Sequence, residues 1–198
     1  DPNPDAPGDA IVFFDGFSGD ALDPAWLDVT GDDTGADAYT FDEGAIKHLD
    51  AASSDFLVRT DIDTFNTFVE VKVLYEDAGA GFSQVGVLTG VTQANPVTGV
   101  DCRVSASNGN LSVGHIDGGQ FQNPPGSIDP QALGETVGRT FTLVVGATSE
   151  TDCILYDDDV VSVAATPPVS GGLGVRVVNA NADIQAIVVY RVAVVPSP

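Results

Sequence analysis

The alternation of apolar and polar residues is the main signal along this chain. Between residues 65 and 75, Val69, Val71, Val73 and Tyr75 fall on one side of an extended backbone, and the intervening residues are mostly polar. A period of two residues is typical of a half-buried β-strand. No segment keeps an apolar period of 3.6 residues, so we predict an all-β chain with almost no helix.

Short strands separated by turn residues are expected along the whole chain. Three pairs of strands flank a tight polar turn and are predicted hairpins; the turns are 42–44, Asn108-Gly109 and 157–159. The predicted strands cover 11–17, 26–29, 38–41, 45–49, 56–59, 65–75, 84–91, 102–106, 111–116, 139–145, 153–156, 160–163, 171–178 and 184–195. Residues 118–134 hold three Pro and are expected to form a loop. Roughly a dozen strands at this spacing predict an antiparallel β-sandwich or barrel.

The composition supports this fold class and excludes several functions. Asp, which favours turns, supplies 24 of the 29 acidic side chains, and 28 Val suit a pleated sheet. A net charge of −22 with only 7 Lys and Arg excludes a nucleic-acid or anionic membrane surface as partner. The apolar runs are far shorter than the ~20 residues of a membrane-spanning helix. We expect one domain over residues 11–198, because no linker interrupts it.

The cellular compartment is inferred from the first residues and the cysteines. Residues 1–10 are dense in Pro and Asp, and we interpret them as a tether or arm left after removal of a signal peptide. The protein would then be secreted, extracellular or at the cell surface, where Cys102 and Cys153 would be oxidised. The alternative is two buried free thiols, because two cysteines alone are weak evidence for a disulfide.

Three stretches resemble one known family. Residues 13–26 carry Asp15-Gly16-Phe17 at the end of the first strand and Leu22-Asp23-Pro24-Ala25-Trp26 soon after it. Residues 141–161 and then 172–192 follow in the order of later strands and hairpins. Together they resemble a concanavalin A-like (laminin-G-like) jelly roll, and the resemblance covers nearly the whole chain after residue 10.

The resemblance implies a jelly-roll sandwich and leaves the function open, because the fold serves lectins, glycosidases, adhesion modules and structural proteins. The chain departs from the family pattern at two places. Asp157-Asp158 stands where the family usually has Asp-Gly or Asn-Gly, and Val188 or Val189 stands where it often has Asp.

Glycosidases of this fold carry carboxylates in a Glu-x-Asp-x-x-Glu pattern on one strand, and none of the five Glu begins that pattern. Asp61 and Asp63 have the spacing of two acids on one strand face but lack a third acid. Neither His lies in a nucleophile motif. We therefore predict a protein without catalytic activity.

Calcium is the one cofactor that the sequence suggests. Asp32, Asp33 and Asp37 place three carboxylates within a short polar loop, and calcium prefers such oxygen ligands. The alternative, which we prefer, is that these residues form turns and add solubilising charge. Residues 157–159 carry three more Asp, but adjacent residues in a tight turn rarely converge on one ion.

Sugar binding needs aromatic and planar polar side chains on an exposed face. Trp26 lies in the opening motif, so we expect it to pack in the core. Arg103 and His115 lie in the two arms of the Asn-Gly hairpin and are expected to share a face. The candidate ligand-binding residues are Tyr39, His48, Arg59, Tyr75, Gln84, Arg103, His115 and Phe121. For each of them, ordinary strand surface is the alternative.

The first functional hypothesis, which rests mainly on the resemblance, is a non-catalytic extracellular lectin-like domain that binds glycan or extracellular matrix. The second is a structural subunit of an extracellular filament or surface assembly. It is motivated by the Pro-rich start and the apolar end at 186–195, through which copies could self-associate by adding to a sheet edge. A glycosidase ranks third for want of paired carboxylates.

Overall fold

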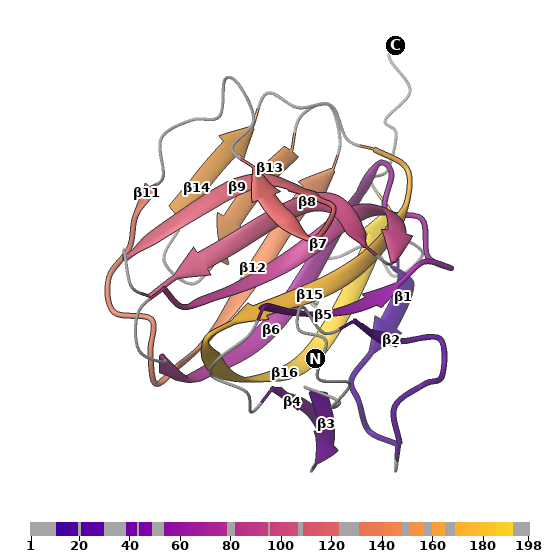
Figure 1. Ribbon diagram of the computed structural model, residues 1–198, viewed down its shortest axis with the longest axis horizontal. Coiled ribbons are helices and arrows are strands. Elements are labelled where there is room, and N and C mark those ends of the chain that lie inside the picture. Colours follow the sequence, from indigo (N-terminus) through magenta and orange to yellow (C-terminus); the bar gives the residue numbers. More distant parts are fainter. Residues whose placement is uncertain are drawn as a thin grey trace.

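In the computed structural model, the chain forms two antiparallel sheets of eight strands each, packed face to face (Figure 1). The structure describes residues 11–19, 21–29, 39–42, 44–48, 54–78, 82–94, 96–106, 109–122, 131–147, 151–156, 160–164 and 169–191. These residues contain no α-helix. The all-β jelly-roll sandwich predicted from the sequence is therefore confirmed.

The first sheet is built around a long central strand, β16. Its strand order is β14-β13-β12-β6-β16-β4-β3, and β1 also pairs with β16. Its strands are β1 (Ile11–Asp15), β3 (Tyr39–Asp42), β4 (Ala45–His48), β6 (Thr67–Ala78), β12 (Arg139–Ala147), β13 (Thr151–Leu155), β14 (Val160–Ala164) and β16 (Ala180–Arg191). One side of β16 pairs with β6, and the other side pairs with β4 at 182–184 and with β1 at 187–190.

The second sheet has the order β10-β9-β8-β7-β15-β5-β2, and β11 also pairs with β9. Its strands are β2 (Leu27–Val29), β5 (Ser54–Arg59), β7 (Gln84–Ala94), β8 (Val97–Ser105), β9 (Asn110–Asp117), β10 (Gln120–Gln122), β11 (Gln131–Ala132) and β15 (Gly172–Val178). The three predicted hairpin pairs are confirmed, because β3 pairs with β4, β8 with β9 and β13 with β14.

Two sequence predictions need correction. The segment 118–134 is not all loop, because Gln120–Gln122 and Gln131–Ala132 both pair with β9. Strands of two or three residues are too short to show an alternation. The last described strand, β16, begins at Ala180 rather than at the predicted residue 184, and its C-terminal half, 186–191, pairs with β6 as a strand. Residues 1–10 and 192–198 lie outside the described residues, so the tether and self-association through the termini stay predictions.

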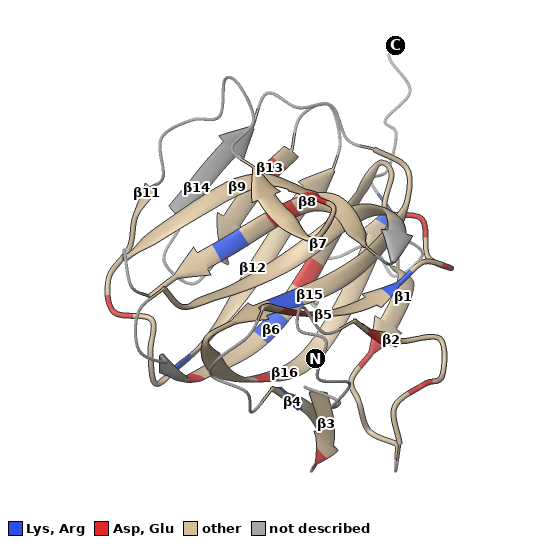
Figure 2. Ribbon diagram, viewed as in Figure 1, with Lys and Arg blue, Asp and Glu red and all other residues tan. Residues whose placement is uncertain are grey.

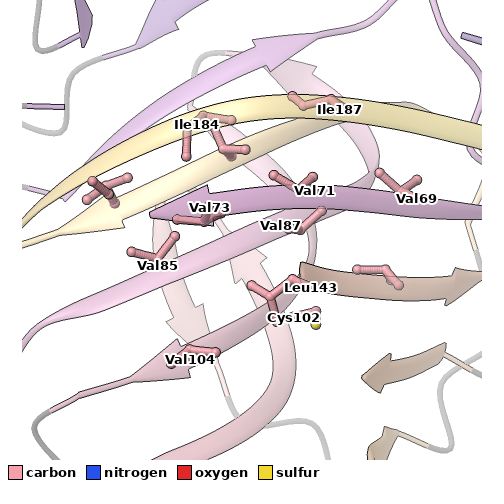
Figure 3. Packing of buried hydrophobic residues seen from close by; sticks show 14 of the residues in the cluster. Val69, Val71, Val73, Val85, Val87, Cys102, Val104, Leu143, Ile184 and Ile187 are labelled. Carbon is pink, nitrogen blue, oxygen red and sulfur yellow. The ribbon is translucent and has the colours of Figure 1, made fainter. Parts of the chain in front are cut away.

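One hydrophobic core fills the space between the sheets (Figure 3). Val69, Val71 and Val73 of β6 face Val85 and Val87 of β7 across it, and all five are fully buried. Each fully buried Val contributes roughly 1.5–3 kcal/mol through the hydrophobic effect. The alternation predicted over 65–75 is confirmed, and it fixes which face of β6 points inward.

A disulfide joins the two sheets through this core. Cys102 lies on β8 in the second sheet and Cys153 on β13 in the first, with their Cα atoms 5.3 Å apart. The predicted pairing is therefore confirmed. Both residues are fully buried, so the bond forms part of the core packing.

Asp183 on β16 is a buried carboxylate whose charge is expected to lower the stability of the fold at neutral pH. One of its carboxylate oxygens is buried and has no hydrogen-bond partner. Burial raises the pKa of Asp183, the negative charge of Glu76 raises it further, and Lys47 opposes the change. An acid whose pKa is raised on folding adds stability at low pH, and this stability is lost as the pH rises through the folded-state pKa.

Asp183→Asn is therefore expected to raise the free energy of unfolding at neutral pH by about 1 kcal/mol, because it removes a buried, poorly paired charge. The gain should vanish below the normal pKa of Asp, where the wild-type side chain is already protonated. Urea denaturation at neutral and acid pH measures both values. A variant that is less stable than wild type at neutral pH would contradict the expectation.

Candidate functional site

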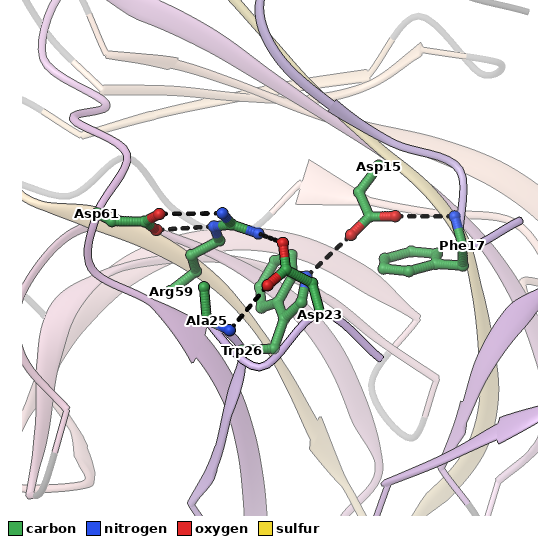
Figure 4. A network of polar contacts seen from close by, with 7 residues as sticks. All are labelled: Asp15, Phe17, Asp23, Ala25, Trp26, Arg59 and Asp61. Carbon is green, nitrogen blue, oxygen red and sulfur yellow. Dashed lines mark hydrogen bonds and ion pairs between the residues drawn. The ribbon is translucent and has the colours of Figure 1, made fainter. Parts of the chain in front are cut away.

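The opening motif forms a polar corner at the end of β1 (Figure 4). The Asp15 carboxylate accepts hydrogen bonds from the backbone N–H of Phe17 at 2.9 Å and from the Trp26 indole N–H at 3.0 Å. The Trp26 ring packs against Phe13 and Phe17, with ring centroids 6.3 Å apart in both pairs. Trp26 is buried, as predicted. The residues that carry the family resemblance thus have a structural role.

Arg59, one of the candidate ligand residues, completes this corner. Its guanidinium donates to both carboxylate oxygens of Asp61 at 2.7 and 2.9 Å, and to Asp23 at 2.8 Å. The bond to Asp61 raises the pKa of Arg59, and the same bond holds the pKa of Asp61 below its usual range. The backbone N–H of Ala25, and then Arg59, lower the pKa of Asp23. Two carboxylates therefore neutralise Arg59 within the fold.

Tyr39 and His48 lie in a buried network between the sheets. His48 contacts the Asp55 carboxylate through Nε2 at 2.8 Å and the Ala180 carbonyl through Nδ1 at 2.8 Å. The Tyr39 hydroxyl donates to the Asp55 carbonyl at 2.9 Å, and burial raises the Tyr39 pKa well above its usual value. Tyr75 is also fully buried, and its hydroxyl donates to Ser83 at 3.0 Å. These three candidates therefore face the interior, where partners within the protein satisfy their polar atoms.

The structure brings three other candidates together on the outward surface of the second sheet. In register, Arg176 of β15 lies opposite Gly86 of β7, Gly86 opposite Arg103 of β8, and Arg103 opposite Ser112 of β9. Residues adjacent to these in sequence, such as Val87 and Cys102, point into the core. We define the arginine face as Gln84, Asp101, Arg103, Ser112, Phe121 and Arg176.

Hydrogen bonds link the residues of the arginine face. Arg103 donates through Nε to Ser112 at 3.0 Å and through Nη1 to Gln84 at 3.5 Å. Its Cζ lies 3.1 Å from the centroid of the Phe121 ring. Arg176 donates through Nη1 to Gln84 and to Asp101, both at 3.1 Å. Gln84, Arg103 and Phe121 were candidates from the sequence and meet here.

Arg176 and Asp101 were not predicted from the sequence. A signal for Arg176 was present, because Leu173, Val175 and Val177 alternate along β15 and face the core. That alternation places Arg176 on the outward surface. Asp101 alternates with Val100 and Cys102 in the same way on β8.

His115 lies in a pocket at one end of the second sheet, which we call the His115 pocket. Its volume is ≈ 460 Å³, and its lining includes Thr98, Val100, His115, Asp117 and Gln122. Val100, His115 and Gln122 are direct cross-strand neighbours on β8, β9 and β10. The pocket therefore presents polar groups from adjacent strands beside an apolar wall.

Arg103 and His115 do not share a face, contrary to the prediction. Ser112, the cross-strand partner of Arg103, points outward, whereas Val113 points into the core. His115 follows Val113 by two residues in a regularly paired strand, so it points to the same side as Val113. The positions of Arg103 and His115 in the hairpin could not show which faces they occupy, because a shift of one residue in the pairing register moves a side chain to the opposite face.

The metal prediction falls outside the described part of the chain. Asp32, Asp33 and Asp37 lie outside the described residues, as does the run 157–159. Among the residues that the structure describes, no group of three or more His, Cys, Asp or Glu is placed to hold a metal ion. No helix in that part of the chain is long and apolar enough to cross a membrane.

Known proteins were compared by sequence and by structure. Neither a protein-family model nor a curated protein matches the sequence. The carbohydrate-binding module CBM66 from Bacillus subtilis aligns with a TM-score of 0.62 at 14% identity, over 81% of this chain and 92% of that chain. The Bacillus licheniformis β-glucanase aligns with a TM-score of 0.60 at 12% identity, over 91% of this chain and 97% of that chain.

A third similar structure is the exoplasmic/lumenal domain of VIP36 in a Ca²⁺- and Man3GlcNAc-bound form. It aligns with a TM-score of 0.61 at 9% identity, over 88% of this chain and 87% of that chain. Binding proteins and an enzyme thus share this architecture, so the likeness identifies the fold alone. The strand order, the two packed sheets and these likenesses together show that the chain has the jelly-roll sandwich fold of concanavalin A-like proteins.

Proposed function

We propose that this chain is an extracellular glycan-binding domain without catalytic activity, and that it binds its ligand in the His115 pocket. The pocket itself is the observation that carries this proposal. Ligand pockets typically have volumes of about 300–1,000 Å³ and combine apolar walls with a few polar groups. The His115 pocket, at ≈ 460 Å³, fits that description.

The lining of the pocket suits the chemistry of a sugar. The His115 ring, the Gln122 amide and the Asp117 carboxylate offer donors and acceptors to hydroxyl groups. Val100 and Val169 offer an apolar surface to the C–H groups of a sugar ring. Both kinds of contact converge from three neighbouring strands, which hold the groups in fixed positions.

The comparisons support a glycan ligand. CBM66 is named as a carbohydrate-binding module, and VIP36 is bound to Man3GlcNAc. The disulfide supports an extracellular location, because such bonds persist in oxidising compartments.

Some similar structures are enzymes, among them the β-glucanase, so the absence of catalysis is a separate part of the proposal. The absence of catalysis is supported by the contacts of Asp61 and Asp63, the two acids that have the spacing of a pair on one strand face. Asp61 binds Arg59, and Asp63 accepts the backbone N–H groups of Phe65 and Gly171, both at 3.1 Å. Both carboxylates thus hold the fold. Incubation with the glycan that binds should release no product.

Gln122→Ala is expected to weaken binding of the glycan found on an array by about tenfold, because it removes amide hydrogen bonds inside the pocket. Calorimetric titration measures the change, and His115→Ala should act in the same direction. Gln185→Ala is the matched control, because Gln185 lies in the first sheet, away from the pocket. A blank array, or equal losses for Gln122→Ala and Gln185→Ala, would contradict the proposed site.

Calcium is part of the same proposal, with Asp32, Asp33 and Asp37 as its ligands. VIP36 in the similar structure is bound to Ca²⁺, which supports looking for the ion here. The titration is repeated after chelation and again with millimolar calcium. Equal affinity and equal melting temperature in both conditions would remove calcium from the proposal.

A further inference from the structure

Two of the seven basic residues of the chain lie side by side on the arginine face. Arg103 and Arg176 are both cross-strand partners of Gly86, one on each side of it. Figure 2 shows how few segments carry Lys or Arg, and β8 and β15 each contribute one of them. In a chain with a net charge of −22, such a pair is an unusual local concentration of positive charge.

Among the residues that the structure describes, Asp101 is the carboxylate that offsets the two guanidinium groups. Asp101 is fully buried, and its Oδ2 accepts from Arg176 at 3.1 Å. Arg103 forms no ion pair with any residue in the described part of the chain. Its hydrogen-bond acceptors there are the neutral side chains of Ser112 and Gln84. Within the described residues, the cluster therefore carries two guanidinium groups and one carboxylate.

Arg59 provides a contrast within the same protein. Two carboxylates surround Arg59, and its pKa is raised. Arg103 has only 8% of its surface exposed, and burial lowers its pKa to about 10. The Asp101 charge opposes this change and the Arg176 charge adds to it. A buried guanidinium without an ion pair of its own is costly, so Arg103 is a charge that the described residues only partly offset.

The arginine face also has an unused acceptor. Oδ1 of Asp101 is buried and has no hydrogen-bond partner. A side chain at position 86 would collide with this oxygen. The Asp101 carboxylate therefore fits here because residue 86 is glycine. Among the described residues, the cluster thus combines a guanidinium that has no ion pair with a carboxylate oxygen that has no hydrogen-bond partner.

We propose that the arginine face binds one oxyanion group of an acidic saccharide, either a carboxylate or a sulfate ester. Arg103 donates to the oxyanion through its planar guanidinium, which suits such groups. The Phe121 ring packs against the guanidinium and holds its plane. The identity of the ligand as a sugar rests on the proposed function, whereas recognition of the oxyanion does not.

The first test compares ligands on the wild-type protein. Glucuronate, its uncharged methyl ester and glucose 6-sulfate are titrated, and NMR follows the Arg103 Nε–H signal. The ester is expected to bind about tenfold more weakly than the better of the two anions, because it loses a charge-assisted hydrogen bond. Preference for glucuronate or for the sulfate identifies the oxyanion. Equal affinity for the ester and both anions would overturn the proposal.

The second test compares two variants that each remove one positive charge. Arg103→Gln is expected to abolish the preference for the anion, whereas Lys72→Gln, on the first sheet, should retain it. The melting temperature of Arg103→Gln is measured beside the titration, because Arg103 also donates hydrogen bonds to Ser112 and Gln84. If Arg103→Gln folds and keeps the preference for the anion, the proposal is overturned. If Arg103→Gln does not fold, the acid and ester comparison on wild type decides alone.

These results are distinguishable from those for the His115 pocket, because the two surfaces lie on opposite faces of the sheet. Gln122→Ala should leave the anion preference unchanged, and Arg103→Gln should leave neutral glycan binding unchanged. Failure of neutral glycans to bind would remove the proposed function without touching the oxyanion site. Loss of both activities in both variants would show one shared site and overturn the separate site proposed here.

Discussion

Replacing Cys102 and Cys153 together by alanine is expected to lower the free energy of unfolding by about 4 kcal/mol. The two residues are 51 positions apart, so their bond closes a long loop in the unfolded chain. Cutting that loop raises the conformational entropy of the unfolded state, and the loss of two buried sulfur atoms adds a smaller packing cost. Equilibrium unfolding in guanidinium chloride measures the difference.

Val104→Ala is the matched control for the packing cost. Val104 lies two residues from Cys102 on the same face of β8, and the variant leaves the bond intact. A reductant should not open the bond in the native protein, because both cysteines are fully buried. A loss no larger than that of Val104→Ala would contradict the expectation, and would show that the unfolded chain is held together in other ways.

The fold could be predicted from the sequence because its signals are local. The alternation at Val69, Val71 and Val73 sets the inward face of β6, and each of the three hairpins is marked by a polar turn. β10 and β11 escaped detection because strands of two or three residues cannot show a period. The length of β16 was misjudged because its polar start at 180–183 does not look like a strand.

The candidate site could be predicted only in part, because the sequence does not show on which face of a sheet a polar side chain lies. Gln84, Arg103 and Phe121 were found, and the structure brings them together. Tyr39 and His48 were chosen for the same chemical reasons, yet they face the interior. Their partners come from other strands, and pairing between distant segments cannot be inferred from spacing. The same limit separated His115 from Arg103.

The two sheets are held together near opposite edges. The disulfide links β8 to β13, whereas His48 and Asp55 link β4 to β5. In the first sheet, β13 and β4 each lie next to an outermost strand, with β12, β6 and β16 between them. The hydrophobic core fills the space between these two links, so each link limits how far one side of the sandwich can open.

Asp55→Ala is expected to cost about 3–5 kcal/mol of unfolding free energy, because it breaks a buried ionisable pair. The Ala180 carbonyl can only accept, so Nδ1 of His48 must donate to it. The Nε2 atom lies 2.8 Å from an oxygen of the Asp55 carboxylate. Without Asp55, Nε2 loses this partner at a fully buried position. Urea denaturation measures the loss, and Asp61→Ala, at a half-exposed carboxylate, should cost much less.

A double-mutant cycle separates the pair from its surroundings. His48→Leu and Asp55→Leu should each be strongly destabilising alone, because each leaves one polar partner buried without the other. The double variant should lose less than the sum of the two by about 1–3 kcal/mol, since no unpaired group remains from the pair. Tyr39 still finds the backbone carbonyl of residue 55 in every variant, so its bond does not enter the difference. Additive losses would show that His48 and Asp55 contribute separately, and that the link between β4 and β5 depends on packing rather than on the contact between the two side chains.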